Sequence, residues 1–361
     1  MRSSIVGKRL GGEVLIVSAM NLKNSVYWVL RAVGIFALGR FLTRQRLRIL
    51  CYHGGSIGDQ SAFNPKLFYP DGRFESRLAW LRQKHFVPVS LSSALSALAA
   101  GRALGPKSVV LTVDDGWFSS KGAIIDPAIE AGFPITLYVA TEVLMQQIPV
   151  IDVTVRYILW KSDKSIVEVA GVMGIPNGRY SLGDQGDRMR LEDAVVANCK
   201  ALSVDSATSV TPFLEEFAAL LGVSAAQLNI GSRRFHYLTV EELLNLCQSG
   251  CAIELHGHAH KYFPGQPDLV ESDIRRCRDL LEKIGVPSPT HYCYPSGEND
   301  AAAAETLRRL GVTSATTCNP GMVVGGAHFS PYYLPRFLDG GNVSMIEFEA
   351  EMSGVAAAVR S

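Results

Sequence analysis

Residues 108–116 read Ser-Val-Val-Leu-Thr-Val-Asp-Asp-Gly, an apolar run rich in β-branched residues that ends in two acids and a glycine. The run lacks polar alternation, so it predicts a strand of a parallel sheet that is covered on both faces. In such folds the catalytic groups follow the carboxyl ends of the strands, which makes Asp114 and Asp115 candidates. The alternative is a structural role, in which the two acids cap the helix that follows.

Strand-like and helix-like segments alternate on both sides of this stretch. Strands are predicted at 47–52, 86–89, 134–139, 251–255, 290–294 and 313–317, and helices at 74–84, 90–100, 121–131, 239–249, 269–284 and 301–310. The alternation predicts an α/β fold, with a parallel sheet that is open or closed into a barrel and is covered by helices. Residues 145–235 break it with glycines, prolines and helical pieces, and predict a partly helical insertion.

Composition narrows the class of protein. The 361 residues carry 35 basic and 34 acidic side chains, a net charge of +1, which excludes the overall basic charge of a nucleic-acid-binding protein. The seven cysteines form no C-x-x-C motif, so a disulfide framework or a cysteine zinc site is not expected, and a reducing compartment fits better.

The first 46 residues form a basic and apolar N-terminal segment. Residues 1–48 hold nine basic residues and one acid, and residues 26–42 are apolar apart from Arg31 and Arg40. We interpret residues 20–46 as a helix that lies on an anionic membrane surface. The alternatives are a helix that packs on the domain, and a membrane span or uncleaved signal anchor. Met20 is an alternative start of the chain.

A second group of polar residues follows the predicted strand 251–255. Three of the eight histidines fall within five residues, at His256, His258 and His260. Neutral imidazole is the commonest protein ligand for metals near pH 7. One aspartate from residues 114–115 with two of these histidines makes a three-ligand set for Zn²⁺ that leaves positions open for water and substrate. The second aspartate could then accept a proton.

Together these motifs resemble those of the polysaccharide deacetylases, the NodB-homology domains or family 4 carbohydrate esterases. The resemblance covers roughly residues 47–340. Thr112–Gly116 is similar to the family motif Thr-Phe-Asp-Asp-Gly, His256–His260 to His-[Ser/Thr]-x-x-His, and Tyr292–Gly297 to the Arg-x-Pro-Tyr loop; segments 131–139 and 238–260 also fit. The resemblance implies a distorted (β/α)7-type barrel at 47–345 with the insertion at about 145–235, and a C-terminal tail at 346–361.

The same resemblance assigns the metal site and the base. It implies that Asp114 is the general base and that Asp115, His256 and His260 hold a divalent metal, whereas His258 is not a ligand. Zn²⁺ is the expected metal, and ligand type alone also allows Co²⁺, Ni²⁺ or Fe²⁺.

Three further catalytic residues are implied. The backbone N–H of Ser296 would stabilise the oxyanion. Two motifs, Tyr52-His53 and Leu334-Pro335-Arg336, are similar to those of the poly-N-acetylglucosamine deacetylase branch. They make His53 the candidate general acid and Arg336 the partner that tunes the pKa of Asp114. The alternatives are an ordinary histidine at a strand end and a surface arginine.

The chain departs from the family pattern at four motif positions. Val113 replaces Phe and Gly257 replaces Ser or Thr, while Cys293 and Ser296 stand where the family has Arg and Tyr. The late Leu-x-His motif is not evident, so the general acid depends on His53.

These inferences predict a carbohydrate deacetylase, a hydrolase of carbon–nitrogen bonds other than peptide bonds. It would remove acetyl groups from an N- or O-acetylated sugar or polysaccharide in cell-surface glycan or exopolysaccharide metabolism. A cytoplasmic location is expected, at the inner face of the membrane, and a lipid-linked glycan is the hypothesis that the basic head motivates.

Three other functions are alternatives to a carbohydrate deacetylase. A catalytically silent sugar-binding module would keep the fold and the cleft without turnover. Residues 54–58 spell G-x-S-x-G, which allows a serine esterase using Ser56, although Pro65 and Pro70 interrupt the helix that a nucleophile elbow requires. The H-x-H pattern also occurs in amidohydrolases and metallo-β-lactamase-like hydrolases. Those proteins have the histidines early in the chain or have Asp-His after them, whereas Lys261 follows His260 here.

Overall fold

The computed structural model describes residues 12–172, 174–326 and 329–360, with side chains from residue 22 onward. Its centre is a sheet of eight strands in which every pair is parallel. The order is β11 (Ser314–Thr316), β10 (His291–Cys293), β9 (Ala252–Leu255), β6 (Ile135–Val139), β5 (Ser108–Val113), β1 (Arg48–Tyr52) and β12 (Phe337–Leu338), with β4 (Val87–Pro88) beside β5. The predicted parallel sheet is confirmed.

The sheet curls because one late segment contacts both of its edges. Leu334 pairs with Thr316 of β11, and three residues later Phe337 pairs with Leu50 of β1. The segment from Leu334 to Phe337 therefore bridges β11 and β1, and it carries Arg336. The result is a barrel-like sheet whose strands all end on one side, as predicted for the NodB-homology fold.

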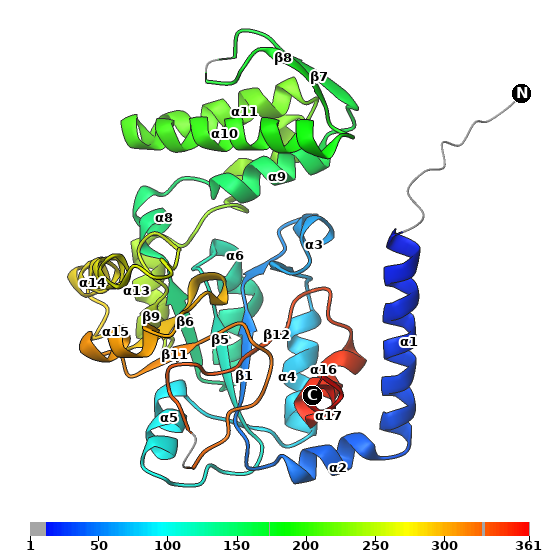
Figure 1. Cartoon of the computed structure of the whole chain (residues 1–361), viewed down its shortest axis with the longest axis vertical. Helices are drawn as coiled ribbons and strands as arrows, with labels where there is room; N and C mark the ends of the chain where they lie inside the picture. The colour runs from blue at the N-terminus through cyan, green and yellow to red at the C-terminus, as the bar shows by residue number, and fades with distance from the viewer. Residues whose placement is uncertain (1–11, 173, 327–328, 361) are drawn as a thin grey trace, which may run out of the picture.

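Helices cover the outside of this sheet (Figure 1). They are α4 (Arg73–Gln83), α5 (Leu91–Ala99), α13 (Val240–Gln248), α14 (Pro267–Lys283) and α15 (Ala303–Arg309). The predicted capping box of α13 is present, with Thr239 and Glu242 each bonding the other's backbone N–H. The helix predicted at 121–131 is instead broken into α6 (Phe118–Ser120), a π-helical turn (Lys121–Ile125) and α7 (Asp126–Glu130). Pro127 lacks the N–H that a continuous α-helix would use there.

The insertion predicted at 145–235 has a hydrophobic core of its own, formed by residues between 148 and 235. After α8 (Thr141–Gln146) it contains α9 (Ile151–Lys161), β7 (Ile166–Val169), β8 (Gly178–Ser181), α10 (Gln185–Asp205), α11 (Val210–Leu220) and α12 (Ala225–Leu228). It sits at the end of the molecule toward which the strands run (Figure 1). Asp59, in the loop before α3 (Gln60–Phe63), ties it to the barrel by ion pairs with Lys161 and Arg234.

The N-terminal segment forms two helices, α1 (Gly12–Ala32) and α2 (Ile35–Leu42). The single helix expected within residues 20–46 is therefore wrong: Gly34 adopts φ 82°, and the axes bend by 78°. No single helix in the described chain is long and apolar enough to cross a membrane, but Leu22–Ala32 with Ile35–Leu42 meets that test as a bent pair. Tyr27 and Phe36 are buried, so one face of the pair packs on the domain.

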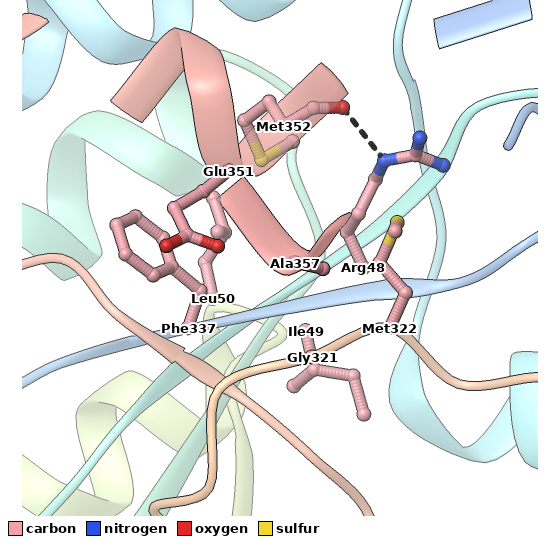
Figure 2. Close-up of a pocket in the computed structure, with 9 residues that line it drawn as sticks. All are labelled: Arg48, Ile49, Leu50, Gly321, Met322, Phe337, Glu351, Met352 and Ala357. Carbon is pink, nitrogen blue, oxygen red and sulfur yellow. Dashed lines mark hydrogen bonds between the residues drawn. The ribbon is translucent and has the colours of Figure 1, made fainter. Parts of the chain in front are cut away.

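Residues 346–360, expected as a C-terminal tail, belong to two helices, α16 (Met345–Ser353) and α17 (Val355–Arg360). They lie against α1 and α2 (Figure 1). Arg48 of β1 fixes them to the barrel, because its buried Nε donates to the carbonyl oxygen of Met352 at 3.1 Å (Figure 2). This contact lies where β1 begins, at the opposite end of the strands from Asp114.

Candidate active site

Asp114 and Asp115 follow the last residue of β5 and are both buried. Asp115 has φ 76° and Gly116 φ 101°, so the chain turns sharply at the strand end and directs the two carboxylates differently. The indole Nε1 of Trp117 donates to Oδ2 of Asp115 at 2.8 Å, which leaves Oδ1 for other partners. Local turn geometry therefore fixes the orientation of the carboxylate.

Two of the three clustered histidines face that oxygen. Nε2 of His256 lies 3.2 Å and Nε2 of His260 lies 3.0 Å from Oδ1 of Asp115. Nδ1 of His256 is 2.8 Å from the carbonyl oxygen of Cys293, a partner that requires a proton on Nδ1 and so leaves the Nε2 lone pair free. His258 instead bonds Oγ1 of Thr141 through its Nδ1, away from the carboxylate.

Asp273 of α14 holds the histidine loop in place. Its two carboxylate oxygens accept the backbone N–H groups of His258 and Ala259, each at 2.8 Å. The loop passes so close to it that a Cβ at Gly257 would lie 2.6 Å from Oδ2 of Asp273. This close approach, with φ 80° at Gly257, explains why glycine stands where the resembled family has Ser or Thr.

Asp115, His256 and His260 fit a divalent metal by the chemistry of their donors. One carboxylate oxygen and two imidazole nitrogens lie within 4.8 Å of one another. Burial opposes the charge of Asp115, but the two imidazoles outweigh it and hold the pKa of this carboxyl well below its usual value. An ionised carboxylate with two neutral imidazoles is the donor set of an open, catalytic type of zinc site. The ion that occupies it is not fixed by these donors.

Asp114 is paired with Arg336, as the resemblance implies. Nη1 and Nη2 of the arginine donate to Oδ1 and Oδ2 of the aspartate, both at 2.7 Å. The remaining guanidinium donors reach the carbonyl oxygen of Thr317, Oγ1 of Thr112 and Sγ of Cys293. Every N–H of Arg336 therefore has an acceptor, which a buried guanidinium requires. Arg336 is not a surface arginine, because it is fully buried.

Two thiols complete the surroundings of Asp114. Sγ of Cys51 lies 3.3 Å and Sγ of Cys293 lies 3.4 Å from its Oδ2. Burial raises the pKa of both thiols, so they stay protonated and can donate to the carboxylate. Burial also opposes ionisation of Asp114, but Arg336 outweighs it and lowers the pKa of that carboxyl. The aspartate is held as an ion in a fixed position.

Of the other residues predicted from the sequence, His53 and Ser296 follow the ends of strands, whereas Ser56 is not part of the site. His53 follows β1 and is half-buried, and one of its ring nitrogens lies within 4.8 Å of both Asp114 and the Cys51 thiol. Ser296 is exposed in the turn after β10, with φ 56°. Ser56 lies outside this group: its hydroxyl donates to Gly58 and accepts from Ser61, a local loop contact with no histidine.

Sequence reasoning missed several residues that shape the site, namely Trp117, Thr141 and Asp273, and the contacts of Cys51 with Asp114. Only Trp117 is close in sequence to a predicted residue. Asp273 lies on the buried face of α14, between Val270 and Cys277, and a single acid on the apolar face of a helix is the signal that could have identified it.

One sequence family matches part of the chain, and several solved structures share its fold. Residues 198–315, which include the histidine cluster, match the sequence model of the family described as polysaccharide deacetylase. The chain is similar to the Streptococcus pyogenes deacetylase PplD in complex with acetate, with 15% identity over 85% of this chain and 98% of that chain and a TM-score of 0.55. It is also similar to IcaB from Ammonifex degensii, with 16% identity over 86% and 97% and a TM-score of 0.53.

A third similar structure is a de-N-acetylase from Aggregatibacter actinomycetemcomitans, with 12% identity over 85% of this chain and 99% of that chain and a TM-score of 0.51. At such identities the likeness shows the fold. No curated protein sequence matches the chain.

The family match over residues 198–315 supports the class of a carbohydrate deacetylase, a hydrolase. Residues 198–315 match the polysaccharide deacetylase family model, and the fold is that of the similar deacetylase structures, as the motifs predicted.

Proposed function

We propose that the protein removes the acetyl group from an N-acetylated sugar of a cell-surface glycan or exopolysaccharide, using a divalent metal held by Asp115, His256 and His260. The observation that carries the proposal is the meeting of Asp115 with two imidazole nitrogens at 3.0 and 3.2 Å, beside a buried and ionised Asp114. A silent sugar-binding module would not need either feature.

The protein's own groups have separate tasks in this proposal. When bound, a divalent cation supplies Lewis acidity, which lowers the pKa of water toward about 7 and polarises the acetyl carbonyl. Asp114 accepts the proton of the attacking water, and Arg336 keeps its carboxylate ionised and oriented. A carboxylate with a lowered pKa is a weak base. It therefore accepts this proton most readily from a water molecule whose own pKa is lowered.

The remaining tasks fall to His53 and Ser296. His53 protonates the departing sugar nitrogen, and its place at the end of β1 puts it beside Asp114. The backbone N–H of Ser296, early in a helical turn after Pro295, supports the oxyanion, because the first N–H groups of such a turn have no partner within it. The site thus contains a base, an acid and a donor for the tetrahedral intermediate.

The test compares two histidine variants of the full chain. His256→Ala removes a proposed ligand, whereas His258→Ala changes a neighbouring histidine that bonds Thr141 and is the matched control. Elemental analysis after reconstitution with zinc should find about one ion per chain in the wild type and the control. The ion and the release of acetate from an N-acetylglucosamine oligomer should be lost together in His256→Ala.

Other outcomes would contradict specific parts of the proposal. Equal metal content in both variants would refute the ligand set. A metal-loaded protein without acetate release would refute the substrate. If Asp114→Asn kept both metal and turnover, Asp114 would not be the base, and if Ser56→Ala lost activity, the serine mechanism would replace this one.

A further inference from the structure

Exposed apolar side chains are concentrated on the N-terminal helix pair. Of the nineteen large apolar residues that are exposed in the described chain, nine lie within residues 22–42. On α1 they include Leu22, Val26 and Val29, whose spacing places them on one helix face, and Val33 directly follows the helix. On α2 they are Ile35, Leu38, Phe41 and Leu42; Trp28 is the ninth. A cluster of this kind on a folded domain marks an interaction surface.

This exposed face is distinct from the face that packs on the domain. Tyr27 and Phe36 are buried against α16 and α17, in a cluster that includes Ile346 and Val355. The helix pair is therefore anchored to the fold by one side while its other side is left uncovered. A helix pair that is bent by 78° and packed on the domain does not form a straight membrane span unless it first leaves the domain.

The charges around the uncovered side are basic. Residues 40–46 contain three basic side chains and no acid, and residues 102–107 contain two and no acid. These two segments meet where the strands begin, since the backbone N–H of Lys107 donates to the carbonyl oxygen of Arg44. Arg46 and Arg102 are exposed there.

The nearest acids are already paired. Glu347 of α16 accepts from Lys23, Glu349 from Arg31 and Glu351 from Arg360. Consequently the acids of α16 do not offset the arginines beside α2, and the surface is positive as well as apolar. A partner that covers it must offer both negative charge and hydrocarbon.

Two grooves meet at the C-terminal end of α2 and have this mixed character. One, of about 580 Å³, lies between α2 and α17 and is lined by Leu38, Leu42 and Val355. The other, of about 410 Å³, is lined by Leu98, Val324 and Arg102. Leu42 and Arg46 line both, so apolar and cationic groups alternate across one surface.

We propose that residues 22–46, together with Arg102, dock the protein on the surface of an anionic lipid bilayer, without crossing it. Apolar side chains of α2 enter the boundary between headgroups and acyl chains, and Arg46 and Arg102 contact anionic headgroups. Trp28 suits the same boundary, since its ring lies 5.0 Å from the guanidinium of Arg31. Lipid supplies both chemistries that the surface requires.

The test is co-sedimentation of the full chain with vesicles. Phosphatidylcholine vesicles with and without about 30 mol% phosphatidylglycerol separate charge from hydrophobic binding. The variant Leu38→Gln/Leu42→Gln removes two exposed apolar side chains from α2. The matched control, Met189→Gln/Val204→Gln, makes the same kind of change at exposed positions of α10 in the insertion.

The wild type and the control should bind anionic vesicles at least tenfold more tightly than neutral ones, and the α2 variant should lose most of this binding. Arg46→Ala should weaken binding about fivefold, the contribution of one basic residue near such a surface. Raising the salt from about 0.1 M to about 0.5 M should weaken it further. Acetate release from a soluble oligomer should be unchanged in all these variants, which separates this proposal from the catalytic one.

Three results would overturn the proposal. The first is sedimentation with no vesicle, and the second is equal binding to neutral and anionic vesicles. The third is a concentration-dependent dimer in analytical ultracentrifugation that the α2 variant abolishes and vesicles do not alter. That result would make a second copy of this chain the occupant of the surface.

Discussion

The buried pair of Asp114 and Arg336 allows a quantitative prediction of stability. Their side chains are 3% and 0% exposed, and two hydrogen bonds of 2.7 Å join them. In Arg336→Met the arginine's charge and all five of its N–H donors disappear, while the carboxylate remains buried. Removing one partner of such a pair costs about 3–5 kcal/mol, because the other charge is left without compensation.

The unfolding free energy of the metal-free protein in denaturant measures this loss. Arg336→Met should lose about 3–5 kcal/mol, and the double variant Asp114→Asn/Arg336→Met should recover much of it, since no charge is then stranded. Arg308→Met is the matched control: its partner Glu305 and Arg308 itself are both exposed, so it should lose at most about 1 kcal/mol.

The loss should also depend on pH. Arg336 is the largest influence that lowers the pKa of Asp114, and without it burial is the largest one left, so the pKa of this carboxyl should rise above the usual 3.8. A group with a raised pKa in the folded state destabilises the fold above that pKa, and the deficit should shrink as the pH falls through it. A deficit below about 1 kcal/mol, or a double variant no more stable than Arg336→Met, would refute the reasoning.

Three further predictions follow from the contacts around the site. Asp273→Asn keeps only one of the two acceptors that hold the histidine loop, so chelator competition should show metal affinity about 10–100-fold weaker; unchanged affinity would exclude Asp273 as a positioning residue. Gly257→Ala should lower the melting temperature more than Gly132→Ala, because both have positive φ but only Gly257 has an atom, Oδ2 of Asp273, within 3 Å of the added Cβ; equal effects would contradict the close approach. Burial lowers the pKa of His291 from 6.5 to about 4, so its contribution is complete above pH 6.5 and is lost as the pH falls toward 4. Between pH 7 and pH 5 the wild type should therefore lose about 2 kcal/mol more than His291→Gln in denaturant unfolding, and parallel losses would show that His291 is not responsible.

Local sequence signals predicted most of the elements correctly. The strand at 108–113 has the predicted bounds, and Thr239 caps α13 as predicted, because β-branching and capping act within a few residues. The broken N-terminal helix was missed, since the apolar pattern continues through Gly34 and only its backbone conformation stops the helix. The helicity of residues 346–360 depends on packing against the first helices, which no local pattern reveals.

The assignments within the site had a different origin. The residues alone pointed to one aspartate with two of three histidines, and the choice among them came from the family resemblance. The structure brings the chosen groups together, while their catalytic roles stay predictions. The resemblance predicted Arg336 as a partner of Asp114. The thiol partners could not be found from sequence, because Cys51 and Cys293 lie on separate strands that meet Asp114 only when the sheet forms.

The same curled sheet separates the two proposed activities. Because all its strands are parallel, the segment 44–46 that precedes β1 lies at one end of the barrel, and His53 that follows β1 lies at the other. Helix α2 lies at the first end (Figure 1), whereas Asp114 and Asp115 follow β5 and the histidines follow β9, at the second end. A protein docked through α2 would turn its catalytic end away from the lipid. Docking should therefore leave the site open to a glycan that extends from the surface, and acetate release from a soluble oligomer should proceed as fast with anionic vesicles as without them.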